Sequence, residues 1–164
     1  MTGTPRAGNP GGIDALRWTA PRLGEALEEL ARRAHLRPAA GESPGVPASP
    51  AAQEEREQDR WIDWAAQRLG LEAEAVDAVA PELDALLRGA APALLRFADG
   101  EGTGFLLLLK ATGRVVHLIG PDLRVHERDA AVLRNALCAP YEAPYAAEID
   151  GLLAAAEVQP QRRA

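Results

Sequence analysis

The chain has 164 residues and is 47% apolar, which is enough to form the core of one domain. Its formal net charge is −6 and aromatic residues make up only 4%, so a nucleic-acid-binding surface is not expected. The single cysteine, Cys138, excludes an internal disulfide framework and favours a reducing compartment, the cytoplasm. The N-terminus has no apolar signal core, and the longest aliphatic run, Phe105–Leu109, is far shorter than the ~20 residues that span a bilayer.

The N-terminal part of the sequence predicts one helix between two flexible stretches. Residues 1–15 are rich in Gly, Pro and Thr and are expected to be flexible. Leucine and alanine recur at helical spacing between Pro21 and His35, with Glu and Arg on the opposite face, which predicts an amphipathic helix. The stretch 38–50 carries four prolines and is predicted to be a flexible linker or surface loop.

Two further helices are predicted before the sheet. The first spans about 54–70, with an acidic first turn and a glycine at its end. Trp61 and Trp64 lie on its apolar face and are both interpreted as core residues. The alternation of apolar residues with Glu at 71–76 predicts a short strand, and the stretch 81–89 predicts a short helix that begins with proline.

The second half of the sequence predicts an antiparallel sheet. Apolar runs separated by turn residues indicate hairpins, with strands expected at 92–97, 105–110, 114–119 and 124–127. The run Phe105–Leu109 shows no alternation, which predicts a central strand covered on both faces. Asp129 is expected to cap a closing helix, and a last helix is expected around 148–157. This order of helices, antiparallel strands and helix predicts an α+β fold.

Motifs for nucleotide binding and for serine hydrolysis are absent from the sequence. The phosphate-binding pattern GxxxxGK[ST] does not occur, and the Gly-x-Gly at 102–104 is expected in a hairpin turn, so no nucleotide cofactor is predicted. Ser43 and Ser49 both lie in the proline-rich stretch and are poor candidates for a nucleophile. Asp122, in a Gly-Pro-Asp turn, is interpreted as the cap of that turn.

Two histidines of the predicted sheet are candidate metal ligands. If Ile119 pairs with Arg124 across the turn, His117 and His126 lie opposite each other on neighbouring strands. Zinc needs three or four ligands, and only Asp122 is near, at the turn itself. The two histidines are therefore interpreted as residues of a partly exposed sheet face, and no metal site is predicted.

Cys138 is the one candidate for a cysteine nucleophile. It is expected at the C-terminal end of the closing helix, where the helix dipole disfavours a thiolate. An inert side chain is therefore the favoured interpretation, and an enzyme that uses Cys138 with a nearby histidine is the alternative.

From Trp18 to about Pro140, the sequence resembles the papain-like peptidase domain at the N-terminus of bacteriocin-exporting ABC transporters, which cuts leader peptides after a double glycine. The resemblance rests on the order and spacing of RLGEALEELARRA, WIDWAAQRLGLEAEAV, ELDALLRGAAPALLRF, GFLLLLKATGRVVHLIGPD and AAVLRNALC. It implies a papain-like domain at 16–140, with N-terminal helices packed on a small antiparallel sheet and a closing helix. Residues 141–164 would then form a C-terminal helix or connector.

The catalytic residues of that family are largely missing here. In the family, the first helix starts with a catalytic cysteine, a strand of the sheet starts with a catalytic histidine, and an aspartate orients the histidine. This sequence has no cysteine near Pro21–Glu25, has Gly104 in place of the histidine, and keeps only Asp122. The resemblance therefore implies a catalytically inactive accessory domain, a pseudoenzyme, at the cytoplasmic face of the bacterial inner membrane.

The resemblance also implies partners and a binding site. The expected partners are the transmembrane and nucleotide-binding parts of the exporter and a peptide substrate. An extended peptide is expected in a groove between the first helix and the sheet, near the residues Trp18, Gly104, Phe105 and Asp122. A third possibility is a purely structural interaction domain, in which residues 38–50 fill that groove.

Overall fold

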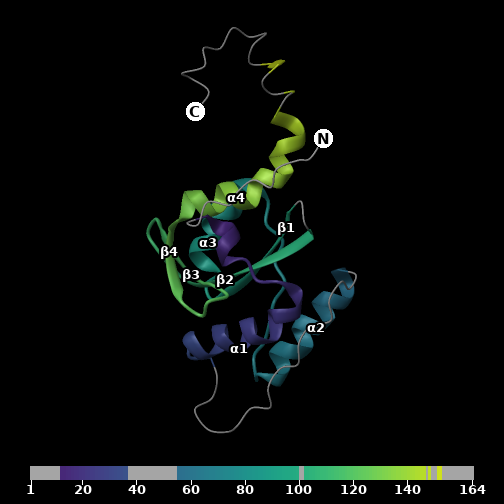
Figure 1. Cartoon of the computed structure of the whole chain (residues 1–164), viewed down its shortest axis with the longest axis vertical. Coiled ribbons are helices and arrows are strands. Elements are labelled where there is room, and N and C mark those ends of the chain that lie inside the picture. The colour runs from purple at the N-terminus through teal and green to yellow at the C-terminus, as the bar shows by residue number, and fades with distance from the viewer. Residues whose placement is uncertain (1–11, 37–54, 100–101, 147, 149–150, 153–164) are drawn as a thin grey trace, which may run out of the picture.

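The structure is a four-stranded antiparallel sheet between two layers of helix, which confirms the predicted α+β class. It is a computed structural model that describes residues 12–36, 55–99, 102–146, 148 and 151–152. Helices α1 and α2 cover one face of the sheet, and α3 and α4 cover the other (Figure 1). The elements are, in order, η1 (Ile13–Leu16), η2 (Ala20–Arg22), α1 (Leu23–Arg33), α2 (Glu55–Arg68), η3 (Ala80–Glu82), α3 (Leu83–Gly89), β1 (Ala93–Asp99), β2 (Gly102–Thr112), β3 (Val115–Ile119), β4 (Val125–Asp129), α4 (Ala130–Glu142) and η4 (Ala143–Tyr145).

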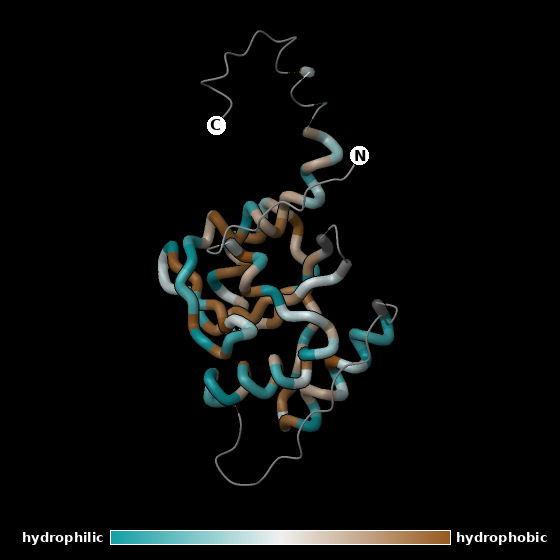
Figure 2. The backbone as a smooth tube through the Cα atoms, viewed as in Figure 1, coloured by the Kyte–Doolittle hydropathy of each residue, from teal (hydrophilic) through white to brown (hydrophobic). Residues whose placement is uncertain are grey.

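Strand β2 lies inside the sheet, between β1 and β3. Its residues Phe105–Leu108 are fully buried, which confirms the prediction of a strand covered on both faces. Figure 2 shows that hydrophobic segments gather in the layer of the sheet, between the helices. Successive side chains of a strand point to opposite faces, so these four residues divide between two cores. Leu106 and Leu108 pack in the core under α3 and α4, and Phe105 and Leu107 pack in the core under α1.

A bulge interrupts the pairing of β2 with β3 at Leu109, between Leu108 and Lys110. In a strand without the bulge, Lys110 would share a face with Leu108 and would point into the core under α3 and α4. The extra residue moves Ala111 to that face, opposite the buried Val116. The only lysine of the chain is therefore kept out of the core and is exposed.

The closing helix α4 begins as the sequence predicts. The backbone N–H of Ala131 donates to Oδ1 of Asp129 at 2.8 Å, which is the expected N-cap hydrogen bond. Leu133 and Leu137 are buried on the face toward the sheet. The helix continues through Pro140 to Glu142, so it crosses the position at which the sequence placed the end of the domain.

Three sequence predictions on local structure were wrong. Residues 71–76 form no strand: 72–76 are exposed, and alternating alanines offer little apolar area to hold them against the domain. Trp64 is not a core residue, because 40% of it is exposed, whereas Trp61 is half-buried against the core under α1. The Gly-x-Gly at 102–104 lies in β2 and not in a turn.

Several predicted segments lie outside the described residues, namely most of the flexible stretch 1–15, the proline-rich stretch 38–50 and most of the last helix at 148–157. Within the part of the chain that the structure describes, no helix combines the length and apolar character needed to cross a membrane.

Candidate functional site

Trp18 pairs with the first part of β2, beyond the end of β3. Its backbone N–H donates to the carbonyl of Phe105 at 2.8 Å, and the N–H of Phe105 donates back to the carbonyl of Trp18 at 3.1 Å. The indole Nε1 donates to the carbonyl of Ile119, the last residue of β3, at 2.8 Å. Both aromatic side chains are fully buried. The N-terminal segment thus occupies the edge of β2 at Phe105, one of the four residues near which a bound peptide is expected.

A peptide that paired with Phe105 would have to displace the segment that ends in Trp18. Ile13 and Leu16 of this segment are also buried, in the core under α3 and α4. Burial of each aliphatic side chain stabilises by roughly 1.5–3 kcal/mol, and Trp18 adds at least as much. If displacement of the N-terminal segment costs about 5 kcal/mol, the edge of β2 is open in a fraction of the molecules on the order of 10⁻⁴. The affinity for a peptide at this edge is lowered by the same factor. The structure therefore corrects the predicted contact set, because a peptide cannot reach the side chains of Trp18 and Phe105.

At Gly104, where the resemblance implies a histidine, two side chains leave little space for a Cβ. A Cβ at this position would lie 2.7 Å from Nε of Arg17 and 2.8 Å from Cζ of Phe97. Arg17 comes from the segment before Trp18, and Phe97 is the residue opposite Gly104 on β1. The glycine therefore permits a close approach of two large side chains, a role that the sequence alone does not reveal.

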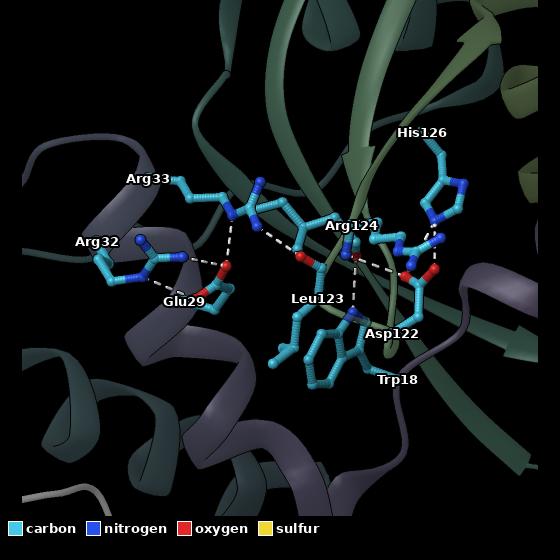
Figure 3. A network of polar contacts seen from close by, with 9 residues as sticks. Trp18, Glu29, Arg32, Arg33, Asp122, Leu123, Arg124 and His126 are labelled. Carbon is cyan, nitrogen blue, oxygen red and sulfur yellow. Dashed lines mark hydrogen bonds and ion pairs between the residues drawn. The ribbon is translucent and has the colours of Figure 1, made fainter.

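Asp122 contacts a histidine on the far side of its turn (Figure 3). His126 Nε2 lies 3.0 Å from Oδ1 and 3.1 Å from Oδ2 of Asp122. The backbone N–H of Arg124 donates to Oδ1 at 3.1 Å, as expected of a residue that caps its own turn. The hydrogen bond with His126, followed by the one from Arg124, lowers the pKa of Asp122 below its ordinary value.

The contact with His126 was missed because the predicted register of β3 and β4 was wrong by one residue. Ile119 lies opposite Val125, and His117 lies opposite Glu127. A shift of one residue reverses the face of every side chain, so the two histidines point to opposite faces and cannot bind one ion. The four-residue spacing of aspartate and histidine across a turn is the signal that could have indicated the contact. No group of three ligating side chains that could hold a metal ion occurs in the described residues.

We expect Asp122→Asn to flatten the acid limb of the stability profile. Since the pKa of Asp122 is lowered in the folded state, its carboxylate stabilises the fold above the unfolded pKa of about 3.9. This contribution is lost as the pH falls through the lowered folded pKa. Urea unfolding between pH 2 and 7 measures the effect, and His126→Asn should remove the larger part of it. An unchanged acid limb in both variants would contradict the assignment.

Side chains between Trp18 and the end of α1 donate hydrogen bonds to every second backbone carbonyl from Ile119 to Leu123. These bonds fix the N-terminal segment and α1 to the β3–β4 turn. Trp18 donates to the carbonyl of Ile119, as described above. Arg22 Nη2 donates to the carbonyl of Pro121 at 3.0 Å, and its guanidinium also binds Glu25 and lies 4.8 Å from the centre of the Trp18 ring. Arg33 Nη2 donates to the carbonyl of Leu123 (Figure 3). The start of α1, the start of β2 and the turn that contains Asp122 therefore meet at one place.

Glu29 holds the two arginines at the end of α1. Its carboxylate accepts hydrogen bonds from Arg32, at 2.6 and 2.9 Å, and from Arg33. These bonds, that of Arg32 first, lower the pKa of Glu29 although its burial opposes ionisation. Arg33 is thereby oriented toward the β3–β4 turn.

Leu123 adopts a backbone conformation that favours glycine, with a φ of 60°. Its N–H donates to the carbonyl of Gly120 at 2.9 Å, which closes the turn. Gly120 is itself required, because a Cβ there would lie 2.7 Å from Oδ1 of Asp122. The turn therefore carries a strained leucine at its tip, and 39% of that leucine is exposed.

Replacement of Leu123 by glycine is expected to stabilise the protein by up to about 1 kcal/mol. Relief of roughly 1–2 kcal/mol of left-handed strain is partly offset by the larger entropy of the unfolded glycine chain. Gly113→Ala is the matched control, since Gly113 has a φ of 61° and open space around it, so alanine should destabilise through strain alone. Urea denaturation compares the two, and a loss of stability in both variants would rule out strain at Leu123.

Cys138 is buried, and the two sheet histidines each contact a carboxylate. The thiol of Cys138 is free and only 8% of the residue is exposed. His117 Nδ1 lies 3.6 Å from the carboxylate of Glu127, and His126 binds Asp122. Among the described residues, no hydroxyl or thiol hydrogen-bonds to His126.

Comparisons with known proteins found no relative of this chain. No family model matches the sequence, and neither a curated protein nor a solved structure matches it.

Proposed function

We propose that the chain is a catalytically inactive, peptidase-like accessory domain of a bacterial peptide ABC exporter. The observation that supports this is that Trp18 and Arg22, just before α1, contact the start of β2 and the β3–β4 turn. The three positions that the resemblance assigns to a catalytic triad therefore lie on neighbouring elements. At that place the histidine position is filled by Arg17 and Phe97. Without a cysteine at the start of α1 and a histidine at position 104, the proposed role of such a site is binding.

The role that fits this arrangement is to bind or position a peptide, or to regulate transport, through contacts at the protein surface. The transmembrane and nucleotide-binding parts of the exporter would be its partners at the cytoplasmic face of the inner membrane. The papain-like fold is part of the same proposal. Binding would use exposed residues near the β3–β4 turn, because the edge of β2 is occupied by Trp18.

A purely structural interaction domain is the second candidate. The observation that favours it is the same filled edge, since the chain places its own Trp18 against Phe105. The segment responsible is the one before α1, whereas the sequence suggested residues 38–50. An enzyme that uses Cys138 receives no such support, because the thiol is buried.

The experiment that tests the proposal is a titration of the ¹⁵N-labelled protein with synthetic double-glycine leader peptides. We expect saturable shifts of amide signals and, by mass spectrometry after prolonged incubation, no cleaved product. Cleavage that stops on alkylation of Cys138 would establish the enzyme instead. Absence of any shift at high micromolar peptide would favour the structural domain.

The link to an exporter is tested by the genes that surround this one. We expect six apolar spans and a phosphate-binding loop, either in the same reading frame or in an adjacent gene, and copurification of this domain with that product. A neighbourhood without membrane-spanning and ATP-binding segments would remove the exporter from the proposal.

A further inference from the structure

The connection between α2 and α3 is an exposed stretch of chain that passes around one edge of the sheet. Leu71 packs against the small core between α1 and α2, as Leu94 of β1 does. Helix α3 lies on the other face of the sheet, so the connection passes around the β1 edge (Figure 1). Residues 72–80 are all exposed, and Val76 and Val79 are 58% and 61% exposed. Two apolar side chains thus face solvent on a segment that belongs to neither core.

The backbone of this connection is available for hydrogen bonding to a partner. Among the described residues, the N–H and C=O groups of residues 72–78 form no hydrogen bond with another backbone group. The alternation of apolar residues with Glu at 71–76 predicts a strand, yet no strand of the sheet pairs with this segment. The connection therefore offers both backbone groups and side chains, as an extended segment that adds to another strand does.

The negative charge of this connection is not balanced by arginine. Residues 69–87 contain five acidic residues and no basic one. Asp84 pairs with Arg134 at 3.5 Å, but among the described residues the other four carboxylates form no ion pair. Helix α2 does not compensate, since it contains four acidic residues and three arginines. A second copy of this surface would therefore be repelled, and a basic partner is attracted.

The start of the connection forms an open pocket with α2. This pocket has a volume of about 390 Å³ and is lined by Asp63, Gln67, Leu71, Glu72 and Ala73. Two carboxylates lie there beside an aliphatic side chain, which suits a lysine or arginine, because these combine an apolar stem with a charged end. The last arginine of α2, Arg68, is engaged elsewhere: its guanidinium lies over the ring of Trp64, 5.1 Å from the ring centre.

From these observations we propose that the α2–α3 connection is a docking surface for an extended basic peptide segment that also carries apolar side chains. The basic side chains face the pocket and the carboxylates beyond it, the apolar side chains cover Val76 and Val79, and the backbone pairs with residues 72–78. The inference goes beyond the proposed function and does not depend on it, because this surface lies at the β1 edge of the sheet and not at the β3–β4 turn.

The test is fluorescence anisotropy with three labelled twelve-residue peptides that alternate Leu with Lys, Ser with Lys, and Leu with Glu. We expect saturable binding of the Leu/Lys peptide, at least tenfold weaker binding of the other two, and weaker binding as salt is raised. Amide hydrogen exchange of residues 72–78 should slow in the complex, which would place the peptide on this segment.

Matched variants separate this surface from the net charge of the whole chain. Glu72→Gln/Glu74→Gln should weaken binding of the Leu/Lys peptide about tenfold. Glu142→Gln/Glu148→Gln is the control, because it removes the same charge from two exposed positions at and beyond the end of α4, and it should change the affinity less than twofold.

A second pair of variants tests the apolar contact. Val76→Ser should weaken binding of the Leu/Lys peptide about fivefold. Val132→Ser is its control, since Val132 is 51% exposed but lies on α4, and it should leave the affinity unchanged. Circular dichroism establishes that each variant is folded.

Four outcomes would overturn the proposal. The Leu/Lys peptide does not bind, or the Ser/Lys peptide binds equally well, which would indicate attraction by charge alone. The third is that Glu142→Gln/Glu148→Gln weakens binding as much as Glu72→Gln/Glu74→Gln does. The fourth is slowed hydrogen exchange at other amides but not at residues 72–78, which would place the peptide on a different surface.

Discussion

Trp18→Ala is expected to lower the free energy of unfolding by about 3–5 kcal/mol, the largest effect of any single substitution considered. The indole is fully buried and fills the core between α1 and the sheet. It also supplies the hydrogen bond to the carbonyl of Ile119. Urea denaturation followed by far-ultraviolet circular dichroism measures the loss.

Two further variants separate packing from hydrogen bonding at this position. Trp18→Phe keeps much of the apolar volume but leaves the buried carbonyl of Ile119 without its donor, which costs about 1–3 kcal/mol. Trp64→Ala is the control, because Trp64 is 40% exposed and its loss should remain below about 1 kcal/mol. Equal losses for Trp18→Ala and Trp64→Ala would show that the N-terminal segment is not packed as described.

Gly104→Ala is expected to destabilise by about 1–3 kcal/mol, although it adds a single methyl group. The new Cβ would meet Phe97 at 2.8 Å, and this ring is buried and has little room to move. Gly89→Ala is the matched control, since Gly89 has open space around it and should tolerate alanine without loss. Thermal unfolding ranks the two variants.

The same site makes a reverse experiment informative. Gly104→His would reintroduce the side chain that the resemblance assigns to this position, yet we expect it to destabilise more than alanine and to create no peptidase activity. Shortening the opposing ring with Phe97→Leu should recover part of the stability of Gly104→Ala, because the two residues share one space. A Gly104→Ala variant as stable as Gly89→Ala would contradict the close approach.

Much of the fold was predictable because the spacing of apolar residues along the sequence indicates which side chains are buried. The uninterrupted run Phe105–Leu109 indicated a strand covered on both faces, and Asp129 indicated the start of α4. The strand proposed at 71–76 failed because periodicity does not show whether a partner strand exists. The bulge at Leu109 could not be predicted from the sequence either, because it keeps Lys110 out of a core that is formed by residues distant in the sequence.

The candidate site was predictable only as a set of positions. The resemblance grouped Trp18, Gly104, Phe105 and Asp122 as a binding site, which stays a prediction. In the structure, Trp18 pairs with Phe105, next to Gly104, and the turn of Asp122 is bonded to Arg22. The sequence did not show that Trp18 fills the edge of β2, because a β-bridge between residues so far apart leaves no local pattern. The partner of Asp122 was missed through an error of one residue in register, which is set by the turn and not by the strands.

The indole bond of Trp18 joins residues separated by 101 positions, whereas every strand of the sheet pairs with its neighbour in sequence. Closing a loop of that length is entropically more demanding than forming a hairpin, so the sheet can assemble before the N-terminal segment is in place. The surface formed by the β3–β4 turn and α1 would then be complete only at the last step of folding. A nascent chain that has made its sheet would still lack the contacts of Trp18 with β2 and with the end of β3, so Phe105 would lie uncovered until the N-terminal segment has docked.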